Sequence, residues 1–176
     1  LNVIYSPNLY SNSLGYSATA KEKANDFNQL IINPNVKAII FAKGGANCNS
    51  ILDMLNYEEI KKNPKFIVGF SDNTVLLNAI YKKTGLVTYH FTNFKGFCEE
   101  NLLYNKKQFE CVMINGSKGE VQQESIWSTI QTGIAKGKLI GGNLASFVKI
   151  LNTEYCPNFK NKILFLEDLS IESDIE

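Results

Sequence analysis

Several features that would assign a protein quickly are missing from this sequence. Its 176 residues contain one histidine, and the four cysteines are widely spaced, with no C-x-x-C pair. Because a zinc site needs closely spaced Cys and His ligands, we expect no metal centre, and we expect reduced, buried thiols. No apolar run is long enough for a membrane span and no signal peptide is recognisable. We therefore expect a cytoplasmic protein, unless a targeting segment lies outside these residues.

A strong net charge is missing as well. The chain contains 18 basic and 17 acidic side chains, which gives a formal net charge of +1. Nucleic acids and anionic membranes attract concentrated positive charge, so we expect neither as a partner. Hydrophobic residues make up 44% of the chain, enough to bury a core, and charged residues make up 20%, which is typical of a globular protein.

Strand and helix signals alternate along the chain. A capping box at residues 19–22 opens an amphipathic helix that ends at Pro34. Short apolar runs between the helical segments are typical of buried parallel strands. The sequence therefore predicts an α/β fold, with a mostly parallel sheet and flanking helices. The predicted strands lie in residues 1–10, 36–42, 66–70, 86–89, 139–140 and 163–166, and the predicted helices in 20–33, 50–55, 72–83, 102–114 and 144–151.

The signal weakens in the middle of the chain, where residues 116–132 are polar and irregular. We therefore divide the chain into three parts. Residues 1–115 form an N-terminal α/β domain, residues 116–136 form a connecting segment, and residues 137–176 begin a second domain.

One turn between a strand and a helix carries a candidate nucleophile. The run GFSD at residues 69–72 lies where the predicted strand stops and a helix begins. A serine there is exposed at the carboxyl edge of the sheet, and the helix N-terminus favours developing negative charge. This arrangement at Ser71 is typical of a nucleophile elbow. Asn73 replaces the last glycine of the G-x-S-x-G pattern, and the alternative is that Ser71 or Asp72 only caps the helix.

Other candidate residues lie at the ends of other predicted strands. Gly44 and Gly45 follow the strand before that of Ser71. A double glycine allows close backbone approach and could supply an oxyanion-hole N–H, although a simple tight turn is the alternative. Glu167 ends the last predicted buried strand and could orient an imidazole as the acid of a triad. The alternative is an exposed carboxylate at a strand end.

The single histidine and the single tryptophan are weaker candidates. His90 follows the strand 86–89, and we expect it to be a packed or surface residue that does not reach Ser71. Trp127 lies in the irregular segment, where it could stack on a flat ligand or pack in the core or a lid.

Six blocks in a fixed order give these signals a common explanation. In this order they resemble the LD-carboxypeptidase family of serine peptidases, and residues 44–52 are most similar to its microcin C self-immunity branch. The blocks are residues 33–39 (NPNVKAI), 44–45 (GG), 64–74 (PKFIVGFSDNT), 84–88 (TGLVT), 141–144 (GGNL) and 163–168 (ILFLED).

The resemblance implies a Ser-Glu-His triad in which Ser71 is the nucleophile and Glu167 the acid. It also implies an oxyanion hole made by the backbone N–H groups of Gly45 and Asp72. The family's catalytic histidine lies in a C-terminal region beyond Glu167, and its fold begins with a strand and a helix that are not recognisable here. We expect both parts to be missing from these residues, so that this piece alone is inactive.

The resemblance also implies the class of substrate. The family hydrolyses an amide beside a free carboxylate, in L,D-linked murein peptides or, in the immunity branch, in peptidyl or aminoacyl nucleotides. Gly44 and Trp127 would contact this small peptide or peptide conjugate. No metal or organic cofactor is implied, and a homodimer is left open. Two alternatives from other classes are an inactive peptide-binding module that keeps the pocket and a small α/β binding domain unrelated to peptidases.

Overall fold

A three-stranded parallel sheet organises the N-terminal half of the protein. The structure, a computed structural model, describes residues 2–13, 16–98, 102–121 and 126–169. Strand β4 (Phe66–Gly69) lies between β3 (Ala38–Ile40) and β5 (Tyr89–His90). Parallel neighbours need crossover connections, and helices provide them. The helices of this half include α1 (Ala20–Ile32), the 3-10 helix η1 (Cys48–Met54), α2 (Tyr57–Lys62) and α3 (Thr74–Thr84), and two short 3-10 helices, η2 (Ser71–Asn73) and η3 (Phe94–Phe97).

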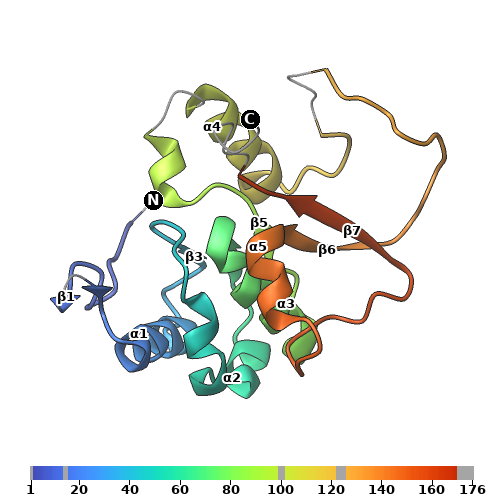
Figure 1. Ribbon diagram of the computed structural model, residues 1–176. Coiled ribbons are helices and arrows are strands. Elements are labelled where there is room, and N and C mark those ends of the chain that lie inside the picture. The colour runs from blue at the N-terminus through green and yellow to red at the C-terminus, as the bar shows by residue number, and fades with distance from the viewer. Residues whose placement is uncertain (1, 14–15, 99–101, 122–125, 170–176) are drawn as a thin grey trace, which may run out of the picture.

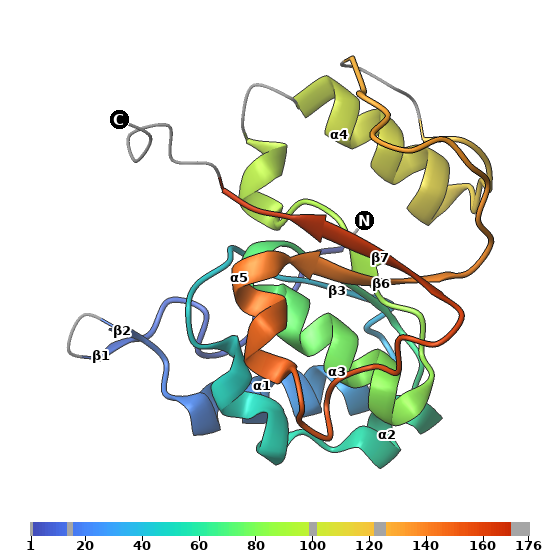
Figure 2. The same ribbon diagram turned by 45° about the vertical axis from the view of Figure 1, so that its right-hand side comes forward.

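The C-terminal half adds a two-stranded sheet. Strands β6 (Lys138–Asn143) and β7 (Lys162–Glu167) are parallel, and they are connected through α5 (Leu144–Phe147) and the 3-10 helix η5 (Val148–Ile150). Helices α1, α2 and α3 lie on one side of these strands (Figures 1 and 2). On the other side lies α4 (Leu102–Phe109), which continues as a π-helix over Glu110–Ile114. The predicted α/β class, with parallel strands and flanking helices, is confirmed.

The hydrophobic core is centred on β4 and α3. Ile67 of β4 is fully buried, and residues 74–80 of α3 are buried without a break. Burying one such aliphatic side chain contributes roughly 1.5–3 kcal/mol, so the start of α3 is held firmly against the sheet. The turn between β4 and α3 is consequently fixed at both ends.

The sequence predicted the start of one α-helix and the end of another, and both are formed as expected. At the start of α1, Thr19 and Glu22 form the predicted capping box, in which each side chain accepts a hydrogen bond from the other's backbone N–H. At the end of α3, Gly85 has a φ of 76°, a left-handed conformation that glycine adopts without strain.

Two buried side chains of α3 join the halves. The Asn78 amide accepts a hydrogen bond from the Gly141 N–H (3.1 Å) and donates one to the Gly141 carbonyl (2.7 Å). The Asn78 side chain thus takes the place of a neighbouring strand for β6. One turn earlier, the Thr74 hydroxyl accepts a hydrogen bond from the Asn143 N–H (2.9 Å). Strand β6 is therefore aligned along α3 by polar contacts as well as by packing.

One strand of the sequence-based prediction was wrong, and some short elements were not predicted. Residues 2–6 form no strand, and Val3, Ile4 and Tyr5 are more than half exposed, because no strand among the described residues pairs with them. A short antiparallel pair forms later instead, between β1 (Asn12–Ser13) and β2 (Tyr16–Ser17). Helix α2 was not anticipated, because six residues are too few to show a clear period.

The burial of β7 and of the thiols also differs from expectation. The side chains at 164–166 are 43–45% exposed, because among the described residues β7 pairs only with β6 and its outer edge is open. Cys98 is exposed, and the other three cysteines are partly buried. All four are free thiols, as predicted. No helix in the described part of the chain is both long and apolar enough to cross a bilayer.

Replacing Asn78 by alanine should destabilise the fold by about 2–4 kcal/mol. The change leaves both the N–H and the carbonyl of Gly141 without their partner, and each unsatisfied buried group costs roughly 1–3 kcal/mol. Urea unfolding measures the effect. Asn25→Ala, on the exposed side of α1, is the matched control and should stay within about 0.5 kcal/mol of the parent. Equal stability of the two variants would contradict the role given to Asn78.

Candidate active site

Ser71 lies at a sharp turn between β4 and α3. Strand β4 ends at Gly69, and the 3-10 helix η2 (Ser71–Asn73) leads directly into α3. Ser71 has a φ of 61°, in the left-handed region that costs roughly 1–2 kcal/mol for a residue with a Cβ atom. Such strain is stored where the surrounding structure enforces it, often at functional sites. The predicted elbow-like strand, turn and helix at Ser71 is confirmed.

The loop after β3 packs directly against this turn. A Cβ atom added to Gly44 would lie 2.8 Å from the Ser71 Cβ, 3.0 Å from its Oγ and 3.6 Å from the Asp72 backbone nitrogen. Only a glycine allows the loop to approach so closely. The peptide group between Gly44 and Gly45 therefore lies beside the Ser71 hydroxyl and the Asp72 N–H. A Cβ atom at Gly45 would lie 3.9 Å from the Asp72 carboxylate.

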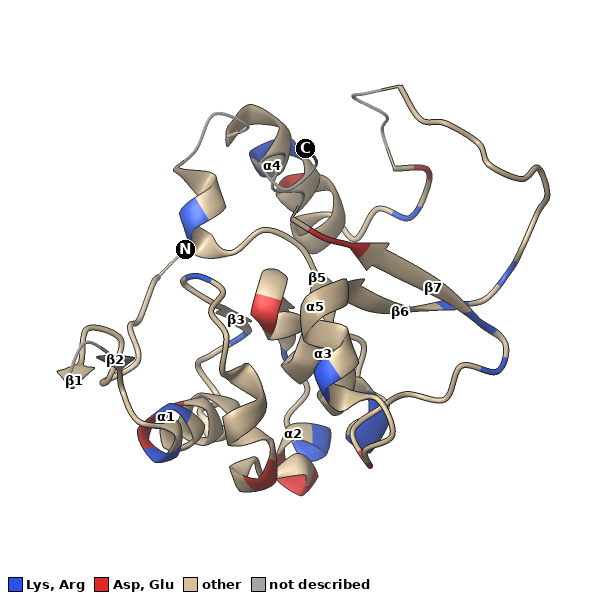
Figure 3. Cartoon of the chain, viewed as in Figure 1, with Lys and Arg blue, Asp and Glu red and all other residues tan. Residues whose placement is uncertain are grey.

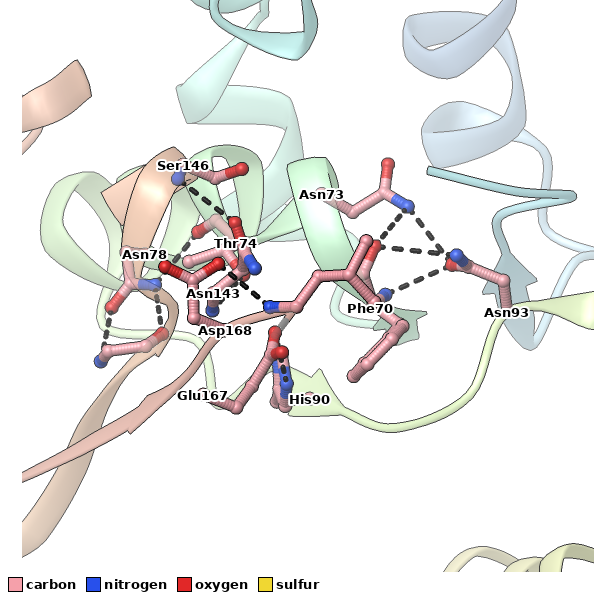
Figure 4. Close-up of polar contacts among 12 residues, drawn as sticks. Phe70, Asn73, Thr74, Asn78, His90, Asn93, Asn143, Ser146, Glu167 and Asp168 are labelled. Carbon is pink, nitrogen blue, oxygen red and sulfur yellow. Dashed lines mark hydrogen bonds and ion pairs between the residues drawn. The ribbon is translucent and has the colours of Figure 1, made fainter. Parts of the chain in front are cut away.

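Asparagines hold the turn where the usual motif has a glycine. The Asn73 amide donates hydrogen bonds to the carbonyls of Phe70 (3.0 Å) and Lys43 (3.3 Å) and to Asn93 Oδ1 (3.0 Å). The same Asn93 oxygen also accepts the Phe70 N–H (3.0 Å). Asn73 and Asn93 thus fasten the end of β4 to the loops on both sides, as Figure 4 shows for the bonds among the labelled residues. Asn73 is therefore a structural part of the elbow and no obstacle to it.

The Asp72 carboxylate is almost completely buried, with 2% of the residue exposed. Its Oδ2 accepts the Cys48 N–H (2.7 Å). Its Oδ1 accepts hydrogen bonds from the Lys149 ammonium (2.7 Å) and the Ser146 hydroxyl (3.3 Å). A buried carboxylate is tolerated only with such partners. The backbone of Asp72 faces Gly44 while its side chain ties three segments together. In the described part of the chain, basic and acidic residues are interspersed along the elements (Figure 3).

Glu167 and His90 meet at the carboxyl ends of β7 and β5. His90 Nε2 lies 3.8 Å from Glu167 Oε1, and Figure 4 shows the two side chains next to each other. This distance is too long for a hydrogen bond. Among the described residues, neither ring nitrogen of His90 nor Glu167 Oε1 has a hydrogen-bond partner, although all three atoms are buried. Glu167 thus keeps one carboxylate oxygen available inside the site.

The surroundings of this pair shift both groups toward their neutral forms. Burial lowers the pKa of His90, whose ring contacts the rings of Phe70 and Phe165. Burial also raises the pKa of Glu167, against a hydrogen bond from the Asn143 side chain that lowers it. His90 is therefore a neutral, aromatic-packed imidazole at neutral pH. Since neither of its nitrogens is hydrogen-bonded, it is not bonded to Ser71, in agreement with expectation.

Trp127 is not brought into this cluster of polar contacts. It lies in the extended segment between the described residues 126 and 137, and it is 59% exposed. Its role in substrate binding stays a prediction, as do the roles given to Gly44, Gly45, Asp72, Ser71 and Glu167. In the described part of the chain, no three His, Cys, Asp or Glu residues are grouped so that they could hold a metal ion.

Some residues of the site were missed by sequence reasoning. Asn143 was only part of a glycine-rich block, yet it contacts Glu167 and caps α5 by accepting the Ser146 N–H (3.0 Å). Asn93 and Lys149 carried no local signal. Their partners are 20 and 77 residues away in sequence, a separation that periodicity cannot reveal.

The strain at Ser71 can be measured directly. Ser71→Gly should be more stable toward urea than Ser71→Ala by about 1 kcal/mol, because glycine adopts the left-handed conformation freely while alanine keeps the Cβ clash. Ser50, in η1, is the control position, where glycine should instead be less stable than alanine. A Ser71→Gly variant no more stable than Ser71→Ala would argue against a strained turn.

Comparison with known proteins places this chain in one family. Residues 1–91 match a model of the LD-carboxypeptidase N-terminal domain, and residues 136–175 match a model of the LD-carboxypeptidase C-terminal domain. Over 88% of its length, the chain is 36% identical to the putative carboxypeptidase YocD of Bacillus subtilis. Over 86% of its length, it is 34% identical to the microcin C7 self-immunity protein MccF of Escherichia coli.

A solved structure agrees with these matches. The muramoyltetrapeptide carboxypeptidase of Oxalobacter formigenes superposes with a TM-score of 0.74 and 26% identity, over 90% of this chain. The chain covers 59% of YocD, 53% of MccF and 54% of the solved structure, so it spans about half the length of the relatives it matches. On the strength of the two domain matches and the shared fold, this chain belongs to the LD-carboxypeptidase family.

Proposed function

We propose that the protein is a serine carboxypeptidase that hydrolyses an amide next to a free carboxylate, such as the L,D-linked bond of a murein tetrapeptide. The observation that carries the proposal is the left-handed turn at Ser71, against which Gly44 is pressed. This geometry holds the Ser71 hydroxyl beside the Gly44 loop, in the short helix η2 that leads into α3. Relatives that are named as carboxypeptidases, including a muramoyltetrapeptide carboxypeptidase, support the class of substrate.

In this proposal, the Ser71 oxygen attacks the amide carbonyl and its proton passes to an imidazole. The negative charge on the carbonyl oxygen is stabilised by the N–H groups of Asp72 and Gly45, which the close approach of Gly44 brings toward the same space. The imidazole then protonates the departing amine, and water hydrolyses the ester formed on Ser71. Glu167 orients the imidazole and stabilises its positive charge, using the oxygen that has no partner among the described residues.

The imidazole is proposed to come from outside these 176 residues. His90 is the only histidine in the sequence, and it packs against two phenylalanines with no hydrogen bond to Ser71. A triad without its base loses roughly a millionfold in turnover. We therefore propose that the 176-residue chain alone is inactive and that the complete gene product is active.

Similarity to the microcin C7 self-immunity protein favours a second substrate class. In that alternative, the same Ser71 chemistry would cleave a peptidyl or aminoacyl nucleotide, and Trp127 would stack on the base. An inactive peptide-binding module is the remaining alternative.

Turnover of a murein tetrapeptide and of a peptidyl adenylate by the complete gene product separates these possibilities. The proposal expects release of the C-terminal residue of the tetrapeptide. Ser71→Ala should lower the rate by roughly a millionfold and Glu167→Gln by roughly 10⁴-fold, because removing the triad acid costs less than removing the nucleophile.

Exposed residues supply matched controls for these substitutions. Ser128→Ala and Glu58→Gln should leave turnover unchanged. Faster cleavage of the adenylate than of the tetrapeptide would replace the murein substrate by the nucleotide conjugate. Turnover of neither substrate, with the peptide still bound, would identify a binding module.

A further inference from the structure

Lys149 is the least expected member of the site, because it comes from η5 in the C-terminal half. Its ammonium group lies 2.7 Å from Asp72 Oδ1 and also donates to the Ala46 carbonyl (3.1 Å). The Asp72 residue is 2% exposed, whereas the Lys149 side chain is 30% exposed. A cation from the C-terminal half thus bridges the residue after Ser71 and the loop after β3.

The loop is held by this pair from two sides. The Asp72 carboxylate accepts the Cys48 N–H (2.7 Å), and Lys149 holds the Ala46 carbonyl two residues earlier. Between them and β3 lies Gly44, whose close approach to Ser71 was described above. The Asp72–Lys149 pair therefore holds the loop after Gly45, while Asn73 holds it at the Lys43 carbonyl before Gly44.

The charge of Lys149 also matters electrostatically. The Asp72 carboxylate is buried within a few ångströms of the loop that would stabilise an oxyanion, and an unpaired negative charge there would oppose the negative charge that develops in the reaction. A cation in direct contact with Asp72 cancels this repulsion. An ordinary surface ion pair would have neither effect, since exposed pairs contribute little.

We propose that Lys149 is a positioning residue of the active site, which neutralises the buried Asp72 carboxylate and fixes the loop of residues 43–48 against Ser71. The inference rests on the proposed function for its effect on turnover. Its structural part stands on the hydrogen bonds alone and can be tested without substrate.

The test compares Lys149→Met, Lys149→Arg and the control Lys160→Met, an exposed lysine of the same half, in the complete gene product. Amide hydrogen exchange is followed in peptides covering residues 43–50 and, as an internal reference, residues 75–80 of the buried helix α3. We expect exchange at 43–50 to be at least about tenfold faster in Lys149→Met, with the reference peptide little changed. Lys149→Arg, which keeps the charge and the donors, should restore most of the protection.

Kinetics with the murein tetrapeptide form the second readout. Lys149→Met should lower kcat by about tenfold to a hundredfold and leave KM within about threefold, because the repulsion acts on the charge formed in the reaction. Lys149→Arg should recover at least half of the lost kcat, and Lys160→Met should match the parent.

The two readouts keep the claims separable. Unchanged exchange at 43–50 in Lys149→Met, or an equal rise in the reference peptide, overturns the positioning role whatever the turnover. If the parent protein does not turn over the tetrapeptide, the proposed function fails, and the exchange comparison still decides whether Lys149 positions the loop. If Lys149→Met does not fold, Lys149→Gln replaces it, since glutamine keeps a donor for Ala46 without the charge.

Discussion

The left-handed backbone of Ser71 is the constraint on which the rest of the site depends. A chain that turns this sharply from strand to helix must be held at both ends, and both ends are buried: Ile67 precedes the turn and residues 74–80 follow it. The turn also needs a neighbour without a side chain, and Gly44 meets that need. The glycine loop, the amides of Asn73 and Asn93, and the start of α3 all pack around this one conformation and hold it in place.

The first turns of η2 and α3 also join the two halves of the protein. Asp72 contacts Ser146 and Lys149, Thr74 contacts Asn143, and Asn78 contacts Gly141. These contacts face the C-terminal half, whereas the Ser71 hydroxyl faces the Gly44 loop of the N-terminal half. The same contacts bring Glu167 to the site, because β7 is paired with β6 in the register that sets Asn143 opposite Glu167. The Glu167 carboxylate, 96 positions from Ser71 in sequence, is thereby brought to the same side of the structure as Ser71.

Much of this architecture could be predicted from local sequence. Local sequence sets the backbone conformation at three positions, whatever the tertiary contacts. They are the capping box at Thr19, the run ending at Ser71 and the glycine at 85. The contacts of Asn78, Asn93 and Lys149 could not be predicted, because a polar side chain shows no partner in sequence when that partner is distant. The exposure of β7 was missed for a related reason. Its apolar run predicts a buried strand, but burial needs partners that are distant in sequence, and in the described residues β7 pairs only with β6 and has an open outer edge.

The central claim is that Ser71 is a nucleophile activated by an imidazole other than His90. Intact-mass and peptide mapping after treatment with a fluorophosphonate, which reacts with activated serines, tests it most directly. The account predicts one label on Ser71 in the complete gene product, retained in His90→Gln, and no label on the 176-residue chain. Labelling of the 176-residue chain that disappears in His90→Gln would contradict it, as would a label on any other serine.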